Sequence, residues 1–131
     1  MSVELLMLVY SAGLFFIIIA VQAGLAIQQN GLMAQAGSRD ELPEPTVLRK
    51  RLQRLTANMQ ENLVLFAIVA LAAHAAGISN ETTALGASLF LYARIAHAIV
   101  YAFGWPMIRP LFYFASLYGI FVIALEALKA Q

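Results

Sequence analysis

The sequence predicts an all-α fold: an integral membrane four-helix bundle that forms one transmembrane domain over residues 1–131. Of the 131 residues, 62% are hydrophobic and only 11% are charged. A soluble domain carries roughly 25% charged residues, so this chain has too few to cover a surface that faces water. Four apolar segments also have about the 20 residues that a helix needs to cross a bilayer. We therefore expect the apolar excess to face lipid.

The first helix is expected over residues 4–28, and its apolar run from Leu5 to Ile27 is interrupted only by Tyr10, Ser11 and Gln22. A secretory signal has a basic start and a small-residue cleavage site. The Met-Ser-Val-Glu start shows neither, so we expect this helix to remain as a membrane anchor. Residues 29–46 are polar, contain glycines and prolines, and are expected to form a loop that is at most partly ordered.

The other three helices are expected over residues 47–77, 81–103 and 108–129. Asn80 can cap the second of these, because an asparagine side chain accepts a hydrogen bond from the backbone of the first turn. A Gly-Trp-Pro sequence separates the last two helices. Pro110 suits the first turn of the final helix, where its missing N–H group is not needed.

Basic residues gather at one end of this predicted bundle. Those between the first two helices, or early in the second, are Arg39, Arg49, Lys50, Arg51 and Arg54. Arg109 joins them between the last two helices, whereas only Lys129 lies on the opposite side. Because lysine and arginine concentrate in cytoplasmic loops, we expect loop 29–46 in the cytoplasm and both termini on the other side.

Composition also excludes several kinds of site. The formal net charge is only +1, and no basic run interleaved with aromatic residues indicates nucleic-acid binding. Without cysteine, the chain has no disulfide and no thiolate nucleophile of its own. His74 and His97 are expected at different heights in the bundle, so we expect no metal site.

A polar stripe runs along the second predicted helix. Its members recur at i, i+3, i+7 and i+10; they are Arg51, Arg54, Asn58 and Glu61. Arg94 and Tyr101 lie at a related spacing on the third helix. At 1.5 Å per residue, Glu61 and Arg94 lie at similar depths, about 15 Å and about 13 Å from the basic end. Because each charge alone costs roughly 2.5–3.5 kcal/mol in the membrane, we expect them to form an inward-facing ion pair.

Several guanidinium groups around one dry pocket would bind an anionic ligand, because arginine pairs with carboxylates through two hydrogen bonds. Any thiol chemistry would have to come from a bound cosubstrate. Simpler interpretations remain open: Arg49 and Lys50 as topology anchors, a Glu61–Arg94 pair with a purely structural role, and His97 as a packing residue.

The motif on the second helix resembles that of the MAPEG family, the membrane-associated proteins in eicosanoid and glutathione metabolism. It reads Arg51-x-x-Arg54-x-x-x-Asn58-x-x-Glu61-Asn62. The segments similar to the family's third helix and following turn are Ala93-Arg94-Ile95-Ala96-His97, Tyr101 and Ile108-Arg109-Pro110-Leu111. Those that resemble its bacterial branch are Ser38-Arg39-Asp40-Glu41 and Gly77-Ile78-Ser79-Asn80.

The resemblance implies a homotrimer in the bacterial inner membrane, with glutathione bound as cosubstrate between neighbouring subunits near the cytoplasmic face. It implies that Arg109 activates the thiol. The residues it implies for holding glutathione are Arg51, Arg54, Asn58, Glu61, Arg94 and Tyr101. A lipophilic second substrate would enter from the bilayer.

The leading hypothesis is thus a glutathione-binding membrane protein, a transferase or peroxidase that acts on lipophilic electrophiles or hydroperoxides. The alternative is a non-catalytic membrane subunit, or a lipid-binding structural component of a larger complex with other membrane proteins. An ion channel is disfavoured, because the charges gather at one end and do not line a path across the membrane.

Overall fold

The computed structural model describes all 131 residues, and every regular element in it is a helix. The elements in chain order are α1 (Val3–Asn30), α2 (Leu32–Ala36), α3 (Val47–Ala75), α4 (Glu81–Phe103) and α5 (Arg109–Lys129). All except α2 are long and apolar enough to cross a membrane. The chain is therefore an all-α, multi-pass membrane protein, as its composition predicts.

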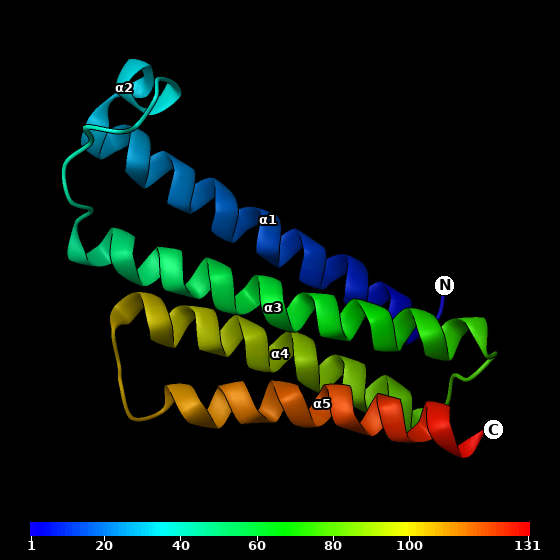
Figure 1. Cartoon of the computed structure of the whole chain (residues 1–131). Coiled ribbons are helices and arrows are strands. Elements are labelled where there is room, and N and C mark those ends of the chain that lie inside the picture. Colours follow the sequence, from blue (N-terminus) through cyan, green and yellow to red (C-terminus); the bar gives the residue numbers. More distant parts are fainter.

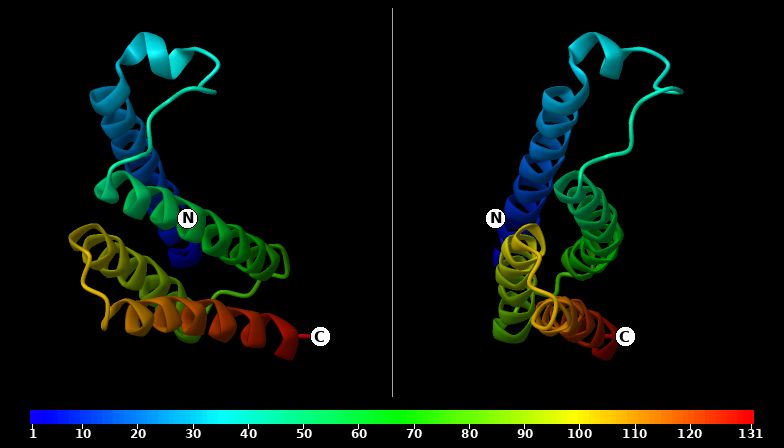
Figure 2. Two further views of the ribbon diagram at one scale, coloured as in Figure 1. Left: turned by 60° about the vertical axis from the view of Figure 1, so that its left-hand side comes forward. Right: turned by 90° about the vertical axis from the view of Figure 1, so that its left-hand side faces the viewer.

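The four long helices run alongside one another, and both termini lie at the same end of the bundle (Figure 1). Helices α3, α4 and α5 stay close together along their length. Helix α1 packs against α3 and α4 and diverges from α3 toward α2, whereas α2 contacts only α1 (Figure 2). The connection between α1 and α3 therefore spans a widening space.

The helix ends follow from local sequence. The Asn80 side chain accepts from the backbone N–H of Thr83 at 3.0 Å, and the Thr83 hydroxyl accepts from the backbone N–H of Asn80 at 2.9 Å, a reciprocal capping box. Gly104 ends α4 with φ of +73°, a left-handed conformation that glycine adopts without a steric penalty. Pro110 lies in the first turn of α5.

The larger core cluster is packed between α3, α4 and α5, and a smaller one joins Ile18 of α1 to α3. The rings of Phe66 and Phe90 stack with centroids 4.2 Å apart. Gly86 on α4 and Gly119 on α5 bring the two backbones into contact, since a Cβ built on Gly86 would lie 2.8 Å from the Gly119 carbonyl oxygen. Many large apolar residues elsewhere remain exposed, including Phe16 at 72%. Such a surface suits lipid and not water.

The expected loop 29–46 contains a short helix, α2. Its sequence, Leu-Met-Ala-Gln-Ala, consists of strong helix formers. The Gln29 side chain fastens the rest of the segment: it donates to the Glu44 carbonyl at 2.9 Å and accepts from the Arg49 guanidinium at 2.7 Å. The segment is therefore more ordered than its glycines and prolines suggest.

A polar cluster closes the end of the bundle that holds the termini. Glu4, only 1% exposed, accepts hydrogen bonds from the hydroxyls of Ser79 and Thr83. Glu126 accepts from the Asn80 amide at 3.1 Å and pairs with Lys129 at 2.8 Å. We call this set, Glu4, Ser79, Asn80, Thr83 and Glu126, the Glu4 cluster. It joins α1 and α5 to the turn between α3 and α4.

Candidate functional site

Arg94 is the most deeply buried charged residue at the centre of the bundle. Its side chain is 1% exposed, and one terminal nitrogen donates to the Asn58 side-chain oxygen at 2.7 Å. Its Nε lies 3.4 Å from the Met59 sulfur, while its other terminal nitrogen, Nη1, has no partner. The chain therefore buries a guanidinium with a free donor and no carboxylate beside it.

A cavity of about 240 Å³ opens beside Asn58, the hydrogen-bond partner of Arg94. Its lining residues come from α3, α4 and α5: Asn58, His97, Tyr101, Arg109, Pro110 and Tyr113. His97 is 3% exposed, and its Nδ1 has no hydrogen-bond partner. We call this space the central cavity. Its walls therefore carry unpaired polar atoms, which normally require a partner when buried.

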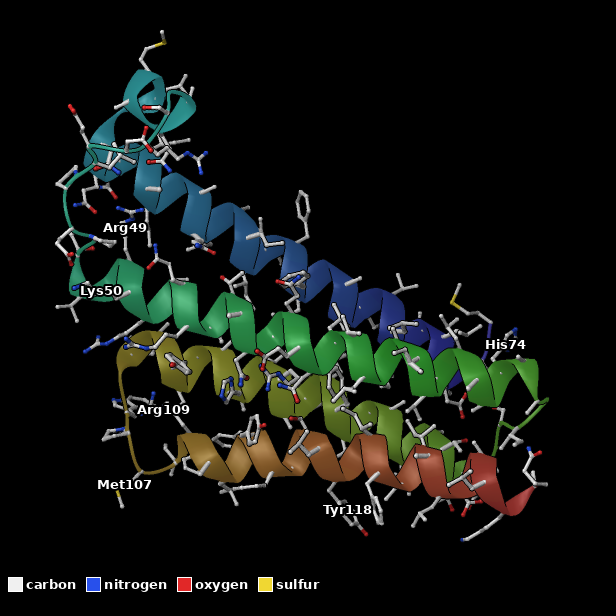
Figure 3. All side chains as sticks on the ribbon, viewed as in Figure 1. Arg49, Lys50, His74, Met107, Arg109 and Tyr118 are labelled. Carbon is white, nitrogen blue, oxygen red and sulfur yellow. The ribbon has the colours of Figure 1, made fainter.

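Tyr101 connects two arginines at the mouth of the central cavity. Its hydroxyl accepts from the Arg54 Nε at 3.2 Å. The Arg109 guanidinium lies 4.8 Å from the centre of its ring, a cation–π contact. The Arg109 Nε is buried without a partner. Figure 3 shows Arg109 at the end of the bundle that also holds Arg49 and Lys50, with His74 at the opposite end.

Arg51 lies outside the central cavity. Its guanidinium packs on the backbone of Gly104, where a Cβ would lie 2.6 Å from the guanidinium carbon. A cation at this position interacts favourably with the negative C-terminal end of the α4 dipole. Within one copy of the chain, Arg51 therefore supports the end of α4 beside the site.

The expected Glu61–Arg94 ion pair does not form. Glu61 is exposed, and the only ion pairs join Lys50 to Glu44 and Lys129 to Glu126. The buried residues of α3 include Leu55, Met59 and Asn62. The predicted stripe precedes each of these by one residue, about 100° around the helix. It therefore flanks the buried face, so that Asn58 reaches Arg94 and Glu61 does not.

His97 and Tyr113 line the cavity but were not among the predicted binding residues. The signal for His97 was present, because it lies between Arg94 and Tyr101 at helical spacing. Tyr113 follows Arg109 by four residues, which puts both on one face of α5. The ring centroids of His97 and Tyr113 lie 6.5 Å apart.

The arrangement suits an anionic ligand with a group that can accept hydrogen bonds. Arg54, Arg94 and Arg109 supply positive charge, and none of them is paired with a carboxylate of the chain. Arginine forms strong charge-assisted hydrogen bonds to carboxylates. A positive charge beside a bound thiol would also favour its thiolate form.

A model of the MAPEG family matches residues 7–129 of the chain. The match includes every residue that lines the central cavity. Neither the curated proteins nor the solved structures give a significant match to the chain.

Proposed function

Because the chain belongs to the MAPEG family, we propose that it is a glutathione-binding membrane enzyme, a transferase or peroxidase for lipophilic electrophiles or hydroperoxides. The observation that carries this proposal is the buried Arg94 with its unpaired Nη1. A buried charge without a partner is strongly destabilising. An anionic ligand in the central cavity would lie against Arg109 and against Asn58, the hydrogen-bond partner of Arg94, and would offset this buried charge.

Glutathione offers two carboxylates, a polar peptide and a thiol. The carboxylates pair with the arginines, and Asn58 and Tyr101 contact the peptide groups. The central cavity alone is small and open, below the roughly 300–1,000 Å³ of typical ligand sites. We therefore propose that a neighbouring copy in a homotrimer completes it. The half-buried Arg51 and the exposed Glu61, on the flank of α3, would contact the same ligand.

Arg109 is the proposed catalytic residue. Its positive charge stabilises the thiolate, as a preorganised donor stabilises developing charge in other enzymes. In the transferase reaction, the thiolate sulfur bonds to an electrophilic carbon and the leaving group departs. In the peroxidase reaction, two glutathione molecules reduce one hydroperoxide to the alcohol and water and become a disulfide.

The arginine-rich end, defined by Arg49, Lys50, Arg51, Arg54 and Arg109, is proposed to face the cytoplasm of a bacterial inner membrane. Lysine and arginine concentrate on that side. A water-soluble cosubstrate then reaches the central cavity from the cytoplasm, and a lipophilic substrate reaches it from the bilayer.

Two measurements test the proposal. Millimolar glutathione should raise the melting temperature of the purified protein, because a ligand that binds only the folded state stabilises it. Arg109→Ala should reduce conjugation of a chlorinated aromatic by about 100-fold or more, the usual cost of losing a transition-state donor. The control Lys129→Ala removes a cation at the opposite end and should retain activity.

Full activity in Arg109→Ala would reject its catalytic role. Absence of any glutathione-dependent stabilisation would reject the binding proposal and favour a non-catalytic subunit of a larger complex. Co-purification with other membrane proteins would support that alternative.

A further inference from the structure

A second and larger cavity lies where α1 diverges from α3, at the arginine-rich end. Its volume is about 510 Å³, within the range of small-molecule sites. The residues that line it are Ile19, Gln22, Ala23, Ala26, Ile27, Leu32, Gln35, Ala36, Arg39, Arg49 and Gln53. None of them lines the central cavity. We call this space the α1–α3 cavity.

Arg49 gives the α1–α3 cavity a buried positive charge. Its side chain is 7% exposed. One terminal nitrogen donates to the Gln29 side chain at 2.7 Å, and its Nε has no partner. The adjacent Lys50 pairs with Glu44 at 2.9 Å, but no carboxylate pairs with Arg49. Buried charges are normally paired. Because the chain supplies no counter-anion for this guanidinium, an external anion would complete its environment.

The rest of the lining selects an amphiphile. Six of the eleven lining residues are apolar, and they form a wall from α1 and α2. The polar lining consists of two arginines and three glutamines, with no aspartate or glutamate. Arg39 donates from its Nε to the Gln35 carbonyl at 2.7 Å, which holds it at the cavity. A small inorganic anion would satisfy Arg49 but would leave the apolar wall uncovered.

We propose that the α1–α3 cavity binds an anionic amphiphile, with its carboxylate or phosphate head on Arg49 and its hydrocarbon chain along α1. The cavity lies at the end of the membrane-spanning part of α1, the depth at which lipid headgroups occur. Charged groups of lipids attract nearby arginines in this region. The site is separate from the proposed glutathione site, so each can be tested while the other is intact.

Binding is tested with delipidated protein in a neutral detergent. The probes are phosphatidylglycerol, palmitate, zwitterionic phosphatidylcholine and inorganic phosphate, each titrated while the melting temperature is followed. Phosphatidylglycerol, palmitate or both should stabilise the protein, and which of them does so identifies the head group. Phosphatidylcholine and inorganic phosphate should have little effect.

Two variants locate the site. Arg49→Gln should weaken binding of the stabilising probe about tenfold or more, as expected for loss of a charged donor. The control Lys50→Gln removes the neighbouring charge outside the cavity and should retain binding. Ala23→Phe keeps Arg49 but fills the cavity from an exposed position on α1, and it should also abolish the effect.

Equal stabilisation by phosphatidylcholine would overturn the proposal, as would equal losses in Arg49→Gln and Lys50→Gln. Unchanged binding in Ala23→Phe would also overturn it, even if Arg49→Gln failed to fold. Glutathione-dependent stabilisation should persist in Ala23→Phe, which separates the outcome from that of the central cavity.

Discussion

The two ends of the bundle treat buried polar groups in opposite ways. In the Glu4 cluster, the carboxylate of Glu4 is enclosed by hydroxyl donors, and that of Glu126 has both Asn80 and Lys129. In the half of the molecule that contains the arginines, buried side-chain nitrogens have no hydrogen-bond partner. They are Nε of Arg49, Nη1 of Arg94, Nδ1 of His97 and Nε of Arg109.

This difference distinguishes a cluster that stabilises the fold from a region that is suited to bind a ligand. An unsatisfied buried polar group costs about 1–3 kcal/mol, so a chain normally satisfies such groups with its own atoms. The Glu4 cluster does so and needs no ligand. Three of the unpaired nitrogens in the other half belong to arginines, and Arg49, His97 and Arg109 border two cavities, which is the pattern of a site that an anion completes.

The largest expected effect on stability comes from removing the Glu4 carboxylate from the Glu4 cluster. Glu4→Ala should lower the free energy of unfolding by about 3 kcal/mol, because it removes charged hydrogen bonds and leaves a void. Unfolding in detergent, followed by circular dichroism, measures this loss. The control Glu81→Ala changes an exposed acid at the same end and should cost less than about 1 kcal/mol. Equal losses in the two variants would show that buried Glu4 contributes no more to stability than an exposed acid at the same end.

An intermediate effect is expected in the other half. Arg94→Met keeps the shape of the side chain but removes its charge, and it should weaken glutathione binding about tenfold. Isothermal titration calorimetry measures the affinity. Stability without ligand should fall less than in Glu4→Ala, because the variant also removes an unpaired buried charge. An unchanged affinity would contradict the assignment of Arg94 to the ligand site.

The smallest effect is expected at the surface pair beside α3. Lys50 lowers the pKa of Glu44 below its ordinary value of 4.5, through a hydrogen bond and through its charge. A lowered pKa contributes stability above pH 4.5 that is lost as the pH falls through the folded-state value. Because Glu44 is exposed, wild type and Glu44→Gln should differ only slightly near neutral pH. Their melting curves should converge in acid, and a difference that grew in acid would contradict this.

The sequence was sufficient for the fold class and the family, because composition, hydropathy and the spaced motif are local properties. It also located Asn80 as a cap, since capping depends on residues within one turn. It was wrong about the inward-facing Glu61–Arg94 ion pair, because the polar stripe of α3 flanks the buried face and leaves Glu61 exposed. Two stripes one residue apart differ by about 100°, and only packing against α4 decides which of them turns inward.

The Glu4 cluster shows the limit of such reasoning more clearly. Glu4 reaches Thr83 across 79 positions of the chain, and no periodic pattern links them. The α1–α3 cavity depends likewise on the angle at which α1 leaves the bundle (Figure 2), a property of the whole assembly of helices.

The contact between Gly86 and Gly119 has a consequence for chemistry at a distance. Only hydrogen atoms fit between these backbones, so this crossing point sets the distance between α4 and α5. His97 lies eleven residues beyond Gly86 and Tyr113 six residues before Gly119, about 16 Å and about 9 Å along their helices. A single methyl group at this crossing point would therefore change the distance between the His97 and Tyr113 rings, although it touches neither of them.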